Sequence, residues 1–66
     1  MDQQDVIERL RAAIDAAGSQ VAFAEKHGVS LQYVNDVVRG RREPGQKILD
    51  ALGIEKLVVY REKQNG

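Results

Sequence analysis

The stretch QVAFAEKHGVSLQYVNDVVRGRR, residues 20–42, holds a glycine between two apolar-patterned segments and ends in three arginines. This pattern predicts a short helix over residues 20–27 and a second helix, capped by Ser30, that ends at about Val38 or Arg39. Gly28 accepts the positive φ that a tight turn between the two helices requires. The stretch therefore predicts two helices joined at a sharp corner.

The residues around this corner suit close packing. Two helices that cross tightly need a small residue at the contact, and Ala24, with Ala22 nearby, meets that need. A short helix, a glycine turn and a capped second helix together have the sequence form of a helix-turn-helix. The apolar side chains placed to lock the second helix onto the first and onto the core are Phe23, Val29, Val34 and Val37.

Another helix is predicted before this pair, from about Asp5 to Ala17. Its apolar residues recur at three- and four-residue steps, which is typical of a helix with one buried stripe. Asp2 or Asp5 suits its N-terminus, and Gly18 suits a left-handed C-terminal stop. Ser19 then caps the helix that begins at Gln20.

The sequence after the pair predicts a fourth helix and a different kind of tail. Gly40 opens a basic loop, and Pro44 at a first helical position begins a helix that ends at Gly53. In the tail, Val58, Val59 and Tyr60 favour either a short strand or an extended arm.

Length and composition exclude several classes of protein. A chain of 66 residues has room for one modest core, which is stabilised by efficient helix packing or by dimerisation. Without cysteine there is no disulfide or thiolate metal site, and His27 alone does not make a zinc site, so we expect no metal and no cofactor. With neither a signal peptide nor an 18-residue apolar run, the sequence predicts a protein that is neither secreted nor inserted in a membrane.

The net charge of zero hides an uneven distribution. Residues 1–25 carry five acidic and two basic side chains, whereas residues 26–47 carry five basic and two acidic ones. An anionic ligand responds to the local field rather than to the net charge. The basic middle of the chain is compatible with DNA binding, although a solvated polar surface would have the same composition.

The helix that Ser30 caps presents two different faces. Val34, Val37 and Val38 lie on one side, and the opposite side is rich in groups of the kind that contact base edges. Amides pair with adenine, a carboxylate accepts from cytosine N4, and an apolar side chain contacts the thymine methyl group. The candidates for base contacts are Leu31, Gln32, Asn35 and Asp36. The candidates for phosphate contacts, at both ends of this helix and at the start of the preceding one, are Ser19, Gln20, Ser30, Tyr33, Arg39, Arg41 and Arg42.

Residues 20–39 resemble the helix-turn-helix of phage Cro and repressor proteins, the Cro/CI-type family. The resemblance rests on Gln20, Ala24, Gly28, Val29, Ser30, Val34 and Val37, and continues through RGRREPGQKILDALGI to cover about residues 4–54. It implies a mainly α, compact, four- to five-helix lambda-repressor-like domain over residues 1–66, with a C-terminal extension from residue 55. It further implies a transcriptional regulator of the bacterial cytoplasm that binds double-stranded DNA at a pseudo-palindromic operator, either as a weak homodimer or as a dimer formed on DNA.

The resemblance also assigns roles to single residues. It places Gln20 on a phosphate, directs Leu31, Gln32 and Asp36 toward bases, and puts Asn35 and the loop over residues 39–42 along the DNA backbone or its edge.

Three features depart from the family pattern. His27 stands where the family has an apolar residue, so its ring either packs in the core or acts as a pH-sensitive switch. Asp36 is acidic on the expected DNA face, where it either contacts cytosine or weakens binding by repulsion. The tail resembles the Cro type, in which a C-terminal strand pairs between subunits; the alternative is a tail that folds back on its own domain.

Two other classes of function compete with DNA binding. An enzyme needs an acid–base pair, an activated nucleophile or a metal cluster, and the acidic residues and the one histidine show no such motif. A protein-interaction module or antitoxin-type domain is the stronger rival, because helix-turn-helix hairpins also serve as docking surfaces. The arginines over residues 39–42 favour DNA, since a docking domain has no need of phosphate-binding groups beside a polar helix face.

Overall fold

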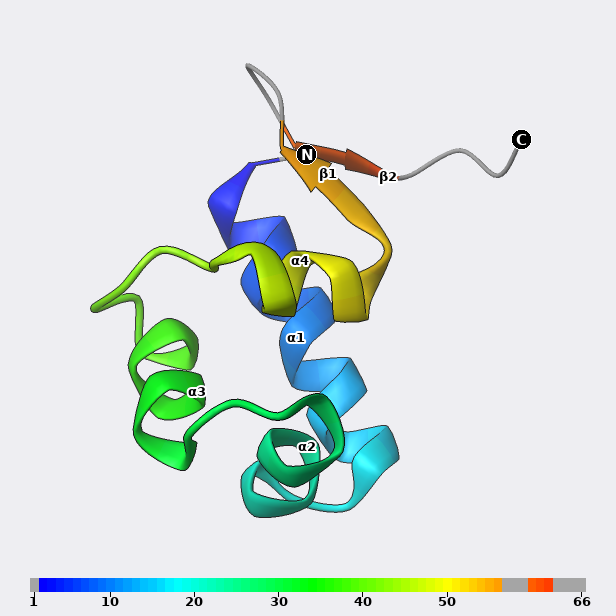
Figure 1. Ribbon diagram of the computed structural model, residues 1–66. Coiled ribbons are helices and arrows are strands. Elements are labelled where there is room, and N and C mark those ends of the chain that lie inside the picture. The colour runs from blue at the N-terminus through cyan, green and yellow to red at the C-terminus, as the bar shows by residue number, and fades with distance from the viewer. Residues whose placement is uncertain (1, 57–59, 63–66) are drawn as a thin grey trace.

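The computed structural model describes residues 2–56 and 60–62, and within them it is mainly helical, as the sequence predicts (Figure 1). In the described residues, four helices are followed by two short strands. The helices are α1 (Gln3–Ala17), α2 (Gln20–His27), α3 (Leu31–Val38) and α4 (Gln46–Leu52), and the strands are β1 (Ile54–Lys56) and β2 (Tyr60–Glu62). No helix in this part of the chain is long and apolar enough to cross a membrane.

Local capping fixes the starts of the first three helices. Helices α2 and α3 begin directly after Ser19 and Ser30, as the sequence predicts, whereas α1 begins at Gln3, two residues before the predicted start at Asp5. The Asp2 carboxylate accepts a hydrogen bond from the backbone N–H of Asp5 at 2.9 Å, and the Asp5 carboxylate accepts one in return from the N–H of Asp2. The hydroxyls of Ser19 and Ser30 each accept from a backbone N–H three residues later. These oxygens satisfy N–H groups that have no partner inside the helix.

The start of α4 differs from the prediction. Pro44 is not a first helical residue: it is buried one position before Gly45, and Gly45 is the N-cap of a helix that begins at Gln46. The reason is a tertiary contact, because the backbone N–H of Gly45 donates to the hydroxyl of Tyr33. A Cβ on residue 45 would clash with that hydroxyl oxygen, so the Tyr33 side chain would have to shift to admit any residue other than glycine.

The core lies among all four helices. Leu10 of α1, Phe23 of α2, Val34 of α3 and Ile48 of α4 are almost completely buried and share one cluster. The ring of half-buried His27 lies 4.5 Å from that of Phe23, centroid to centroid, so it packs beside the core. The complete set of buried residues in this cluster is Leu10, Ile14, Phe23, Ala24, Val34, Val37 and Ile48.

The tail folds back on its own chain. Strands β1 and β2 pair antiparallel, with Ile54 opposite Glu62, and they lie near the start of α1, away from α2 and α3 (Figure 1). Ile54 is fully buried in a second apolar cluster with Val6 and Leu49. An ion pair between Arg9 and Glu62 joins the hairpin to α1. Val58 and Val59, which the sequence assigns to the strand, lie outside the described residues.

Candidate nucleic-acid interface

Helices α2 and α3 meet at a corner that fixes how α3 is presented. Gly28 has φ +66° and ends α2, and the N–H of Val29 donates to the carbonyl of Ala24 at 3.0 Å. Val34 and Val37 of α3 are fully buried against the core. Since one side of α3 is held in this way, its opposite side faces solvent (Figure 1).

The four residues predicted to contact bases lie on or beside this exposed side. Leu31 and Gln32 are exposed, whereas Asn35 and Asp36 are half-buried. The side-chain amide of Gln32 donates to the Asp36 carboxylate at 3.1 Å, one turn along the helix. This bond leaves Gln32 with a carbonyl oxygen and a second N–H, and leaves Asp36 with a free carboxylate oxygen. The two side chains therefore form one exposed unit with both donors and acceptors.

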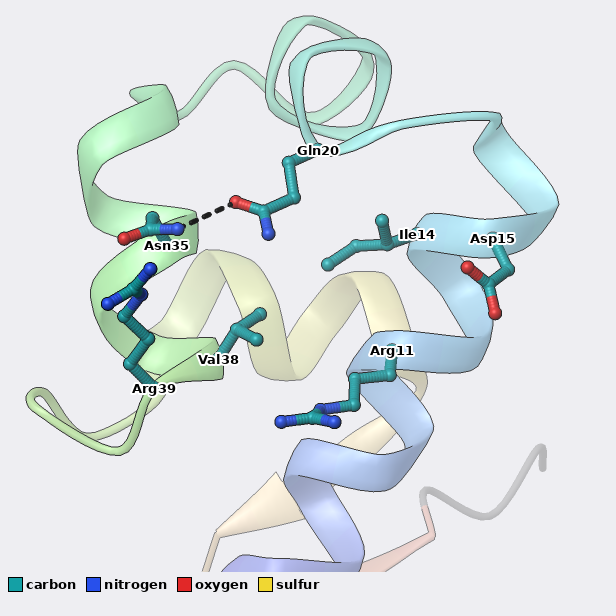
Figure 2. A pocket seen from close by; sticks show the side chains of 7 residues that line it. All are labelled: Arg11, Ile14, Asp15, Gln20, Asn35, Val38 and Arg39. Atoms are coloured by element: carbon teal, nitrogen blue, oxygen red, sulfur yellow. Dashed lines mark hydrogen bonds between the residues drawn. The ribbon is translucent and has the colours of Figure 1, made fainter.

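Asn35 and Gln20, which the sequence places in separate roles, contact each other. The Asn35 amide donates to the side-chain carbonyl of Gln20 at 3.3 Å, joining the middle of α3 to the first residue of α2 (Figure 2). The Gln20 amide N–H groups remain available for a ligand. Gln20 is thus held in position by the helix that is expected to enter the groove.

Tyr33 is half-buried and connects α3 with the loop that follows it. Its hydroxyl accepts from the N–H of Gly45, and the guanidinium of Arg42 lies 5.4 Å from the centre of its ring. The phenol keeps its own proton to donate to a phosphate. Tyr33 therefore orders the basic loop, a role that the sequence does not predict.

The remaining candidates for phosphate contacts lie around this surface. Ser19 and Ser30 already accept capping hydrogen bonds, so each has only its hydroxyl proton to offer a phosphate. Arg39 and Arg41 are exposed where α3 ends and the loop begins. Of the seven predicted phosphate-contacting residues, Ser19 and Ser30 are the N-caps of α2 and α3, Gln20 is the first residue of α2, and Tyr33 lies within α3. The other three, Arg39, Arg41 and Arg42, follow the end of α3.

A cavity of about 510 Å³ lies where α1, the start of α2 and the end of α3 meet. Sequence reasoning missed the contribution of α1, whose Arg11 and Asp15 line the cavity. The available signal was helical spacing, because Arg11 lies one turn before Ile14 and Asp15 on the same helix. Figure 2 shows the lining residues, which are Arg11, Ile14, Asp15, Gln20, Asn35, Val38 and Arg39.

Comparison with known proteins gives a family match. A family model described as Helix-turn-helix, of the Cro/C1 type, matches residues 7–53, from the second turn of α1 to the glycine that ends α4. No curated protein and no solved structure matches the chain.

Proposed function

The chain belongs to the helix-turn-helix family, a family of DNA-binding regulatory domains, and we propose that it is a sequence-specific transcriptional repressor of the phage or prophage Cro type. One observation carries this proposal: Gln32 and Asp36 form a solvent-facing hydrogen-bonding unit on α3, while Val34 and Val37 of the same helix are fully buried. A helix with one fully packed face and one polar face suits insertion into the major groove.

In this proposal α3 supplies the base contacts. The free oxygen of Asp36 accepts from the N4 amino group of a cytosine, and Gln32 uses its carbonyl oxygen and second N–H on an adjacent adenine. Leu31, at the first turn of α3, is 46 % exposed and meets a thymine methyl group. Asn35 lies at the edge of this surface, where its contact with Gln20 also positions α2.

Phosphate contacts hold α3 in register. Gln20 binds the DNA backbone on one side of the groove, and the arginines of the loop after α3 bind it on the other. Ser19, Ser30 and Tyr33 each have a hydroxyl proton to add. Because every neutralised phosphate releases bound counterions, binding of this kind weakens steeply as the salt concentration rises.

The length of α3 supports two copies on one operator. Its eight residues span about 12 Å, so one helix contacts only a few base pairs. Useful specificity then requires two half-sites about one helical turn apart, occupied by a weak homodimer or by a dimer that forms on the DNA. The bound protein blocks access of the transcription machinery to the operator. In this proposal the protein acts at the bacterial nucleoid, in the cytoplasm.

A protein-docking or antitoxin-type module is the second candidate, and one observation favours it. Val21 of α2 and Leu31 of α3 are large apolar side chains that are 48 % and 46 % exposed. Fluorescence anisotropy with a labelled mixed-sequence duplex at two salt concentrations separates the candidates. We expect binding at low salt that falls steeply at higher salt; no binding at low salt would refute the regulator and favour the docking module.

A further inference from the structure

Two arginines from different helices line the cavity between α1, α2 and α3. Arg11 comes from α1 and Arg39 directly follows α3, and Figure 2 shows both side chains beside the same hollow. Within the described residues neither guanidinium makes an ion pair, whereas Arg9 of α1 is paired with Glu62. Arg42 also differs, because it lies over the ring of Tyr33. The two cationic groups at the cavity are therefore free to bind an anion.

The third polar group at the cavity is a donor as well. The carbonyl oxygen of Gln20 is already used by Asn35, so the end of Gln20 that remains is its amide nitrogen. Figure 2 shows this nitrogen directed into the hollow. Asp15 is the one acidic residue among the lining side chains, and it stands on the side away from Asn35 and Arg39 in that view. Two guanidinium groups and an amide N–H outweigh this single carboxylate.

The cavity is continuous with the surface on which the DNA is expected to lie. Gln20, Asn35 and Arg39 belong to both, since each lines the cavity and is also a predicted contact for bases or phosphates. Its volume is within the range of small-ligand sites, which leaves room for a phosphate together with part of its sugar. Arg11 is the cationic residue that extends this surface onto α1.

From these contacts we infer that the cavity binds one backbone phosphate of the DNA, with Arg11 of α1 as a phosphate-contacting residue opposite Arg39 and Gln20. This inference rests on the proposed function and adds a third helix to the interface. A guanidinium donates in a fixed fork that matches phosphate oxygens, and the phosphate relieves the repulsion between two like charges beside one hollow. The α1 contact also fixes how far the whole domain is rotated about α3.

The test compares Arg11→Gln with Arg9→Gln in full-length protein. Both variants lose one positive charge from α1, but residues two apart lie about 200° from each other around a helix, so Arg9 faces away from the cavity. Anisotropy with a labelled duplex is measured at several salt concentrations. For Arg11→Gln we expect the negative slope of log K against log salt to become less steep by about 0.9 per bound copy. Affinity near 0.1 M salt should fall about five- to tenfold.

Each outcome separates the phosphate site from the proposed function. Arg9→Gln should keep the wild-type dependence of log K on log salt, and Arg11→Lys should keep most of it. The melting temperature of Arg11→Gln should equal that of the wild type, because the Arg11 side chain is exposed. Equal slopes for Arg11→Gln and Arg9→Gln would overturn the phosphate site while leaving the regulator intact. A wild-type protein that binds no DNA at any salt concentration would overturn the proposed function, and the phosphate site with it.

Discussion

Replacing Gln32 with alanine tests the proposed base contacts on α3. Gln32 is exposed and its one hydrogen bond in the described structure joins it to Asp36, so its loss should change the free energy of unfolding by only about 0.2–0.5 kcal/mol. On DNA the loss should be larger, because a bidentate contact to adenine discriminates by about 1–3 kcal/mol. We therefore expect affinity for the operator to fall about 5- to 150-fold, with little change on duplexes that already lack the adenine.

The contact between Gln32 and Asp36 allows the coupling free energy between these two side chains in DNA binding to be measured. If the two side chains act as one unit, the double variant Gln32→Ala/Asp36→Ala should lose less affinity than the two single losses added together. The expected coupling is about 0.5–3 kcal/mol, which is the range for residues in one hydrogen-bonding network. The assay is anisotropy with an operator recovered by selection and with a set of its single-base variants.

Two results would refute this reasoning. A loss for Gln32→Ala that is the same on every duplex would show that Gln32 contacts the backbone instead of a base. Additive single losses would show that Asp36 does not act together with Gln32. A rise in affinity on all duplexes after Asp36→Ala would instead favour the alternative in which this carboxylate only repels the DNA.

Four other changes test the loop and the core. Replacing Arg41 and Arg42 with glutamine should weaken binding to all duplexes alike and make the dependence of log K on log salt less steep, as measured by the same titration. An unchanged slope would show that the loop does not contact the phosphate backbone. Tyr33→Phe should lower the free energy of unfolding by about 0.5–1.5 kcal/mol in urea titrations, because the N–H of Gly45 loses its acceptor. Gly45→Ala should lower the free energy of unfolding more in the wild type than in the Tyr33→Phe variant, because that variant lacks the hydroxyl with which the new Cβ clashes. Equal losses of stability in the two backgrounds would contradict the contact between Gly45 and Tyr33. Leu10→Ala should cost about 2–5 kcal/mol, because Leu10 is fully buried; a cost below 1 kcal/mol would contradict the assigned core.

The helices were predictable because local chemistry determines their ends. The side chains of Asp2, Ser19 and Ser30 each accept a hydrogen bond from the backbone N–H three residues later, and Gly28 needs only its own backbone freedom. Each of these residues therefore lies within a few positions of the helix end that it determines. The start of α4 is different. It depends on a hydrogen bond between Gly45 and Tyr33, twelve residues apart, which local propensity does not reveal.

The candidate interface also has features that follow from local sequence and features that depend on tertiary packing. The exposed position of Gln32 on α3 follows from helical spacing, and the structure agrees with it. The contact of Asn35 with Gln20 depends on how α2 crosses α3, and the cavity at Arg11 depends on how α1 packs beside both. These arrangements come from tertiary packing, so the sequence predicts the residue types but not which of them meet.

The most direct test of the central claim is selection of binding sites from a pool of random duplexes by the wild-type protein. Specific docking of α3 in the major groove predicts enrichment of a two-fold related motif, with half-sites centred about 10–10.5 base pairs apart. The same selection with Gln32→Ala should lose preference at one position of each half-site and retain it elsewhere. Binding that enriches no motif would contradict sequence-specific recognition and would leave only a nonspecific affinity for DNA.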